Sequence, residues 1–274
     1  MRSAFLRHVV AVFAAVFFAA LSPLPGRADE APEPEMSEEA WDAVRYNLFG
    51  ERPLEDGAGL LALEMPARAD DAAIVPVTLK TTLPVGDARS VRKFWLVIDE
   101  NPAPLAGAFA FGPSSGVDAL STRVRINAYT YIHGVAELSD GKVYVVKKFI
   151  RASGGCGAPA PKDSVRTDTG AMKLKRFGEK TSREMQIMIR HPNNSGFEMD
   201  PITRSYVPAN YIEELKIWQG ENLLMSMSGA ISISQDPNVR FTYRPNGAMS
   251  IRAEARDTNG ASFKGEWAVE GNGF

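Results

Sequence analysis

The 274-residue chain contains one cysteine, Cys156, and three histidines. A single cysteine excludes a CxxC dithiol centre and a cysteine-based zinc ribbon. His8 lies in the expected leader, so only His133 and His191 remain in the mature chain. Two histidines without a thiolate cluster do not suggest a dedicated metal site. We therefore expect no metal.

Motifs for nucleotide and ester chemistry are also absent. The chain has no GxGxxG or GxxxxGK[ST] loop to cradle phosphate groups and no GxSxG nucleophile elbow. It lacks the basic excess of nucleic-acid-binding proteins, because 31 Lys and Arg residues face 33 Asp and Glu residues. We expect no bound organic cofactor and no nucleic-acid partner.

Long apolar runs are scarce, and the one at the N-terminus is short. Arg2 and Arg7 precede the apolar run Val9–Leu21, and small residues at Gly26 and Ala28 follow it. A membrane-spanning helix needs roughly 20 apolar residues, so an uncleaved anchor is the less favoured alternative. The pattern predicts a Sec-type signal peptide over residues 1–28, cleaved near Ala28, and a periplasmic protein without membrane insertion after cleavage. The acidic, proline-containing residues 29–36 are expected to be disordered.

The mature chain begins with a short helical pattern and continues with short strands. Residues 37–49 read as one amphipathic helix, with Ser37 as N-cap and Trp41, Val44 and Leu48 on one face. Alternating apolar residues and the Asp140–Gly141 turn predict a β-sandwich in residues 37–151. Its expected strands are Ile74–Lys80, Phe94–Ile98, Leu105–Phe111, Leu120–Ile126, Tyr131–Leu138 and Lys142–Ile150.

A second strand-rich region occupies residues 170–274. The two regions together predict an all-β protein of two immunoglobulin-like sandwiches that pack on each other, the first with a short N-terminal helix. The expected strands of the second are Met172–Phe177, Met185–His191, Tyr211–Gln219, Leu223–Met227, Ile231–Ser234, Val239–Arg244, Met249–Ala255 and Phe263–Val269. Residues 152–169, rich in glycine and proline, are expected to be a linker between them.

This linker carries Cys156 among glycines, with little that could pack around it. The composition indicates a mobile loop, and an odd cysteine in an exported protein is a reactive thiol or half of an intermolecular bridge. Several interpretations follow. Cys156 could carry a covalent adduct, pair with His133 or His191 as a hydrolase nucleophile, link two chains by a disulfide, or be incidental. Cationic residues near it in sequence favour a thiolate; they are Lys147, Lys148, Arg151 and Lys162.

Several stretches resemble a known family. Asn101–Gly112, Leu120–Ile126 and Ala136–Lys142, followed by Gly154–Gly157, resemble the SoxY subunit of the sulfur-oxidation carrier SoxYZ. The C-terminal half resembles SoxZ, through Ile189–Gly196, Val207–Ile212 and Arg256–Gly260.

The resemblance implies a carrier and not an enzyme. It implies that Cys156 carries the substrate, such as thiosulfate-derived sulfur, and that Gly154, Gly155 and Gly157 form the carrier arm. The implied partners are periplasmic Sox-type enzymes that load and unload the cysteine. Fusion of the subunits and Ala158 in place of a final glycine depart from the family pattern, because the arm is tethered at both ends.

Fused chains of this kind resemble a subgroup associated with quinoprotein alcohol dehydrogenases. This implies a quinoprotein dehydrogenase system as another possible source of partners. The alternative hypothesis is a non-covalent accessory or docking module for such a system, in which Cys156 is dispensable.

Overall fold

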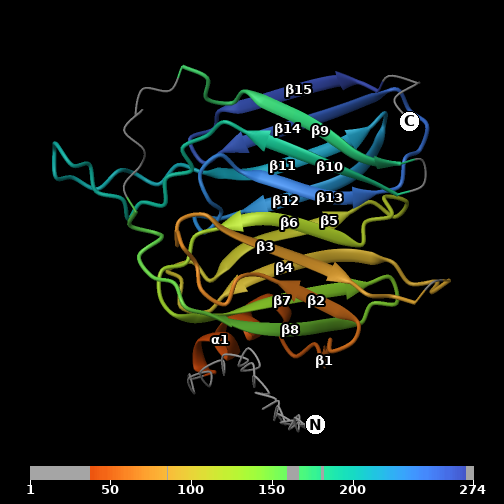
Figure 1. The fold of residues 1–274 in the computed structure, drawn as a ribbon, viewed down its shortest axis with the longest axis horizontal. Coiled ribbons are helices and arrows are strands. Elements are labelled where there is room, and N and C mark those ends of the chain that lie inside the picture. The colour runs from red at the N-terminus through yellow and green to blue at the C-terminus, as the bar shows by residue number, and fades with distance from the viewer. Residues whose placement is uncertain (1–37, 85, 159–166, 180–181, 270–274) are drawn as a thin grey trace, which may run out of the picture. The chain divides into compact units, whose positions relative to one another are not determined.

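The computed structural model describes residues 38–84, 86–158, 167–179 and 182–269 (Figure 1). The expected signal peptide, the acidic residues 29–36 and the expected cap Ser37 lie outside these residues. The described residues form one α-helix, α1 (Glu39–Phe49), and fifteen β-strands, which confirms the all-β prediction. Within this part of the chain, no helix has the length and hydrophobicity needed to cross a membrane.

The first half contains two strands that were not predicted. β1 and β2 have three and four residues, too few for a clear alternating pattern. The strands of this half are β1 (Leu54–Asp56), β2 (Leu61–Glu64), β3 (Val75–Thr81), β4 (Val91–Ile98), β5 (Leu105–Phe111), β6 (Ala119–Val124), β7 (Thr130–Leu138) and β8 (Val143–Ile150).

In the second half, the strand predicted at Ile231–Ser234 is wrong. Ile233 forms only an isolated bridge with Val124. The hydroxyls of Ser232 and Ser234 donate to backbone carbonyls of the first half at 3.0 and 2.7 Å, which ties this segment to loops. The strands are β9 (Met172–Glu179), β10 (Ser182–Ile189), β11 (Ile212–Gln219), β12 (Asn222–Gly229), β13 (Asn238–Tyr243), β14 (Ser250–Asp257) and β15 (Ser262–Ala268).

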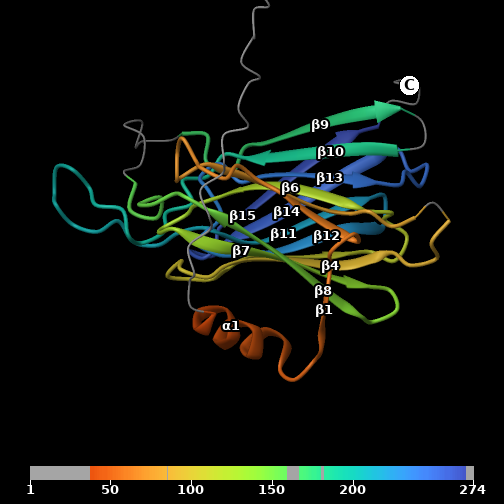
Figure 2. The same ribbon diagram turned by 60° about the horizontal axis from the view of Figure 1, so that its bottom comes forward.

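The strands form two sheets that lie as two layers, and both sheets run through both halves of the chain (Figure 2). The nine-stranded sheet has the order β1-β8-β7-β4-β5-β12-β11-β14-β15, and the six-stranded sheet has the order β2-β3-β6-β13-β10-β9. The halves meet where β5 pairs antiparallel with β12 and β6 pairs antiparallel with β13. The halves are therefore joined edge to edge by backbone hydrogen bonds.

One apolar core fills the space between the layers and draws on both halves. Phe94 and Phe109 from the first half and Met225 and Phe241 from the second are all at most 1% exposed. Each such side chain contributes about 1.5–3 kcal/mol by leaving water. Separating the halves would expose this shared core.

Helix α1 covers the outer face of the nine-stranded sheet (Figure 2). Trp41 and Phe49 are buried there, and Phe49 meets the edge of Trp95 at 5.1 Å between ring centroids. Trp41 stacks on the ring of His133, with centroids 3.8 Å apart and planes 6° from parallel. A second, smaller apolar cluster therefore forms beneath the helix, as the amphipathic pattern predicts.

Candidate functional site: the seat of Cys156

The cysteine segment, defined here as Arg151–Ala158, follows β8 and lies against the chain at the end of β6. Arg151 forms an isolated bridge with Arg68. The backbone N–H groups of Gly154 and Gly155 then donate to the carbonyls of Asn127 and Ile126, each at 2.8 Å. These bonds fix the segment directly before the cysteine.

The three predicted arm glycines occupy three different environments. Gly154 has φ +80° with open space around it, a conformation that favours glycine. Gly155 is threaded between backbones, because a Cβ there would lie 2.0 Å from the carbonyl oxygen of Ala72. Gly157 is exposed, and a Cβ on it would meet only the carbonyl oxygen of Phe197 at 3.5 Å. Gly154 and Gly155 therefore seat the segment.

The thiol of Cys156 is buried, so the expectation that little packs around it is wrong. The residue is 0% exposed, although Ser153, Gly154 and Gly157 on either side are exposed. Burial raises the pKa of the thiol from 9.0 to about 11, against the opposing effect of Arg125. Glu198 raises this pKa further. The seated thiol is thus protonated at neutral pH and a poor nucleophile.

The cation that lowers the pKa of the thiol is Arg125, which was not among the cationic residues predicted from the sequence. Lys147 instead forms an ion pair with Glu38 and lies over the ring of Tyr131. Lys148 is exposed, and the guanidinium of Arg151 lies over the ring of Phe149. Lys162 lies outside the described residues. The predicted cationic setting for the thiolate was therefore assigned to the wrong residues.

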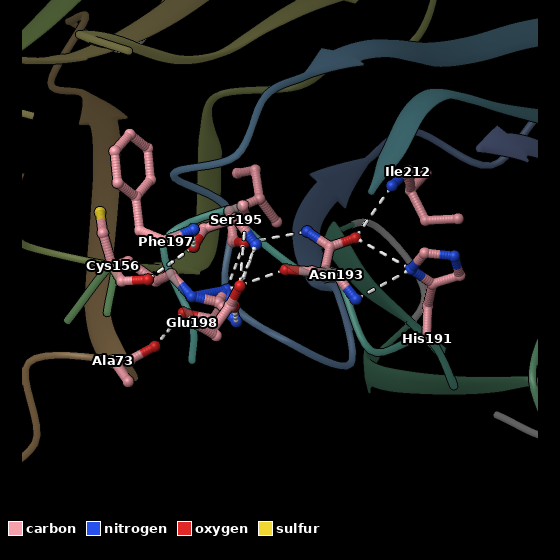
Figure 3. A network of polar contacts seen from close by, with 12 residues as sticks. Ala73, Cys156, His191, Asn193, Ser195, Phe197, Glu198 and Ile212 are labelled. Atoms are coloured by element: carbon pink, nitrogen blue, oxygen red, sulfur yellow. Dashed lines mark hydrogen bonds and ion pairs between the residues drawn. The ribbon is translucent and has the colours of Figure 1, made fainter. Parts of the chain in front are cut away.

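A polar turn from the second half holds the cysteine segment (Figure 3). The hydroxyl of Ser195 donates to the carbonyl of Cys156 at 2.5 Å and accepts the N–H of Phe197 at 3.1 Å. The Cys156 sulfur and the Phe197 ring extend from the network in the same direction. The buried Ser195 hydroxyl therefore links the backbone of Cys156 to the backbone of Phe197.

The carboxylate of Glu198 holds the backbone of Ser195 in place. It accepts the backbone N–H of Ser195 at 2.9 and 2.8 Å and that of Gly196 at 3.1 Å. The guanidinium of Arg125 pairs with the same carboxylate at 3.3 Å, and both side chains are nearly buried. Arg125 also donates to the carbonyls of Asn193 and Ile233 at 3.1 and 3.2 Å. A buried ion pair with additional hydrogen bonds is costly to break, so this clamp defines one position for the turn.

The two candidate partners of the thiol, His133 and His191, bond other residues. Nδ1 of His133 lies 3.0 Å from Asp99 beneath helix α1. His191 accepts the N–H of Asn193 on Nδ1 at 3.0 Å and faces Asp257 with Nε2 at 3.3 Å. Burial lowers the pKa of His191, which favours its neutral form. The described residues thus provide no Cys–His pair for a hydrolase.

Sequence reasoning missed Arg125, Ser195 and Glu198 as parts of the site. Ser195 lies in the stretch Ile189–Gly196, whose resemblance to SoxZ does not assign it a role beside the cysteine. After β10, His191, Asn193 and Ser195 are buried, and Asn193 has φ +50° and is 0% exposed. A run of small polar residues after an apolar strand is a signal for such a turn, but it does not name the segment held.

Family models match both halves of the chain. Residues 45–156 match SoxY, described as sulfur oxidation protein SoxY, and residues 172–268 match SoxZ, described as sulphur oxidation protein SoxZ. The chain is a fused SoxYZ-like protein. The SoxY match ends at Cys156, and the SoxZ match contains the turn that holds it. The protein thus combines the two parts of a sulfur-oxidation carrier in one polypeptide.

Solved structures resemble parts of the chain at low sequence identity. The sulfur carrier protein SoxY from Chlorobium limicola f thiosulfatophilum is 22% identical, covers 42% of this chain and 97% of its own, and has a TM-score of 0.35. A superoxide reductase (neelaredoxin) from Ignicoccus hospitalis is 16% identical, covers 34% of this chain and 79% of its own, and has a TM-score of 0.30. A search of curated proteins gave no match.

Proposed function

We propose that this fused SoxYZ-like protein is a periplasmic carrier that holds a sulfur species covalently on Cys156 and presents it to partner enzymes. The observation that supports the proposal is the place of Cys156. It is the last residue of the SoxY match, and its carbonyl accepts a hydrogen bond from Ser195 of the SoxZ match. The chain has no other thiol.

The buried thiol sets a condition on loading. A protonated and covered sulfur cannot attack a substrate, so the cysteine segment has to leave its seat first. Gly154, at φ +80°, provides one pivot, and Gly157, which is exposed and little crowded, provides another. Movement between these points would expose Sγ while β8 stays in its sheet. The carrier would thus alternate between a closed, unreactive form and an open form.

Loading with thiosulfate is an oxidation. The Cys156 thiol loses its proton, and its sulfur forms an S–S bond with the terminal sulfur of thiosulfate. Joining these two sulfurs releases two electrons. The loading partner is therefore an oxidoreductase with an electron acceptor, and the carrier itself supplies the thiol. Hydrolytic release of sulfate from the adduct would leave a sulfur atom on the cysteine, which a further partner would remove.

The test is intact mass spectrometry of the protein purified without reductant from its own cells grown on thiosulfate. We expect a reducible mass increment that maps to the peptide containing Cys156, and its size identifies the cargo. Cys156→Ser should fold normally, carry no increment and lose thiosulfate-dependent growth. A wild-type protein that stays unmodified while the serine variant supports full growth would refute the carrier and indicate a non-covalent docking module.

The same mass measurement, made on cells grown on a different substrate, tests the quinoprotein partner system. Cells grown on an alcohol oxidised by a quinoprotein dehydrogenase should give the increment only if that system loads Cys156. An increment confined to thiosulfate growth would assign the partners to Sox-type enzymes.

A further inference from the structure

A hairpin of the second half projects beside the cysteine segment. It comprises residues 197–207 and forms the teal loop that extends to the left in Figures 1 and 2. Nine large apolar residues are notably exposed in the described part of the chain, and four of them lie on this hairpin. They are Phe197 at 46%, Met199 at 43%, Ile202 at 89% and Tyr206 at 66%. Such clustering of exposed apolar side chains marks an interaction site.

Internal hydrogen bonds give the hairpin a defined shape. Across it, the N–H of Val207 donates to the carbonyl of Glu198 at 2.8 Å, and the N–H of Asp200 donates to the carbonyl of Ser205 at 2.9 Å. At the tip, the Asp200 carboxylate accepts the N–H groups of Ile202 and Thr203, both at 2.8 Å. These N–H groups, that of Thr203 first, lower the pKa of Asp200. The tip therefore presents Ile202 on an ordered turn.

The same serine hydroxyl holds both the base of the hairpin and the backbone of Cys156. Ser195 bonds both the carbonyl of Cys156 and the N–H of Phe197, the first residue of the hairpin. Glu198, the second hairpin residue, clamps Ser195 through two backbone N–H groups of the turn. A force that moves the hairpin therefore acts on the hydrogen bond that holds Cys156.

We propose that the hairpin is the docking element for the enzymes that load and unload Cys156, and that its displacement on docking releases the thiol. The proposal rests on the carrier function proposed above. Any enzyme that acts on Sγ has to approach within bonding distance of Cys156. It then also reaches the base of the hairpin, because the Ser195 hydroxyl bonds both Cys156 and Phe197. The docked enzyme then gains apolar contact with the hairpin and access to the thiol in one step.

The side chains also indicate the chemistry of the partner surface. Beyond the buried Glu198 at its base, the hairpin has two charged residues of opposite sign, the half-buried Asp200 and the exposed Arg204. The hairpin thus offers an apolar contact without net charge, and it fits an apolar cleft beside the sulfur-handling site of the partner. Association should depend little on ionic strength.

The test compares Ile202→Ser with Met249→Ser in the native host. Met249 is 57% exposed and lies outside the hairpin, so it controls for loss of an exposed apolar side chain. We expect the fraction of loaded Cys156, measured by intact mass, to fall at least fivefold in Ile202→Ser and to stay unchanged in Met249→Ser. Tyr206→Ser should reproduce the loss. Alkylation of the isolated, reduced proteins should proceed at equal rates in wild type and Ile202→Ser, which shows that the seat is intact.

The outcomes separate this inference from the carrier function. Absence of an adduct in the wild type would contradict the carrier, whereas equal loading of wild type, Ile202→Ser and Tyr206→Ser would overturn the docking role alone. Sedimentation of the wild type provides a further check. A concentration-dependent dimer that Ile202→Ser abolishes, together with unchanged loading, would assign the hairpin to self-association.

Discussion

Two neighbouring loops of this protein have exposures opposite to those that their compositions predict. After Arg151, the cysteine segment consists of small residues, yet it is hydrogen-bonded in place and its thiol is 0% exposed. The hairpin at 197–207 contains large apolar residues, yet Ile202 at its tip is 89% exposed. The first loop hides the group proposed to react, and the second displays a surface suited to binding. Together they suggest a carrier that is closed until a partner docks.

The comparison shows what glycine does at each position. Glycine widens the choice of backbone conformations, but neighbouring chains decide whether that freedom persists in the folded protein. At Gly155, the carbonyl of Ala72 leaves no room for a Cβ, so small size serves close packing. At Gly157, a Cβ would make only an ordinary contact with the carbonyl oxygen of Phe197, so the same residue type is not needed for close packing.

The largest predicted effect comes from Gly155→Ala. A Cβ 2.0 Å from the carbonyl oxygen of Ala72 cannot be accommodated, so the cysteine segment has to leave its seat. Release would return the thiol pKa from about 11 toward 9.0. At pH 8 this raises the thiolate fraction about a hundredfold. The alkylation rate at pH 8 should increase by up to that factor.

Gly157→Ala is the matched control for this variant. Its Cβ would meet its nearest neighbour at 3.5 Å, an ordinary contact. The alkylation rate should stay within about twofold of the wild type, since nothing forces the segment to move. Circular dichroism and thermal melting should show that both variants keep the sheets. Equal rates in the two variants would mean that the seat at Gly155 does not control the thiol.

The strands were predictable from two kinds of pattern. β5 was expected at Leu105–Phe111 as a short apolar run and is found there, and β6 alternates between buried and half-buried residues. The continuation of both sheets through the two halves could not be predicted from such patterns. A strand pattern indicates which face is buried, and it does not indicate which strand edges pair. The contact between β5 and β12 joins residues more than 100 positions apart in sequence.

The site was predictable only in part. The sequence singles out Cys156 as its one thiol, and the carrier role of Cys156 and its glycines, implied by the resemblance to SoxY, stays a prediction. The burial of the thiol was not predicted, because the segment packs against the turn at Ser195 and near Arg125. Both residues come from distant parts of the chain, and Ser195 is joined to Cys156 by a hydrogen bond to its backbone carbonyl. No local pattern around Cys156 encodes an acceptor used by a serine 39 positions away.

A smaller effect is expected from Ser195→Ala, which weakens the seat without a clash. The variant loses the 2.5 Å hydrogen bond to the Cys156 carbonyl, worth about 1 kcal/mol. The open population, and with it the alkylation rate, should therefore rise about fivefold. Ser205→Ala, at an exposed hairpin position, is the control and should leave the rate unchanged. A rate in Ser195→Ala equal to that of the control would show that this hydroxyl does not restrain the segment.

The last predicted effect is a pH dependence of stability specific to the cysteine segment. The folded chain retains the Cys156 proton up to about pH 11, whereas an unfolded chain loses it near 9.0. The folded state thus binds more protons between these values, and the free energy of unfolding decreases as pH rises through this window. Below pH 9 the contribution is fully present.

Cys156→Ser isolates this contribution, because lysines and tyrosines titrate in both proteins and cancel in the difference. The urea midpoint of the wild type should fall more steeply than that of the variant between pH 9 and 10.5. Parallel curves would show that the thiol is not held protonated by its seat. Ile202→Ser should follow the wild-type curve, since the exposed hairpin tip does not contribute to the environment of the thiol. Stability would then depend on pH through the buried loop, and partner loading would depend on the exposed one.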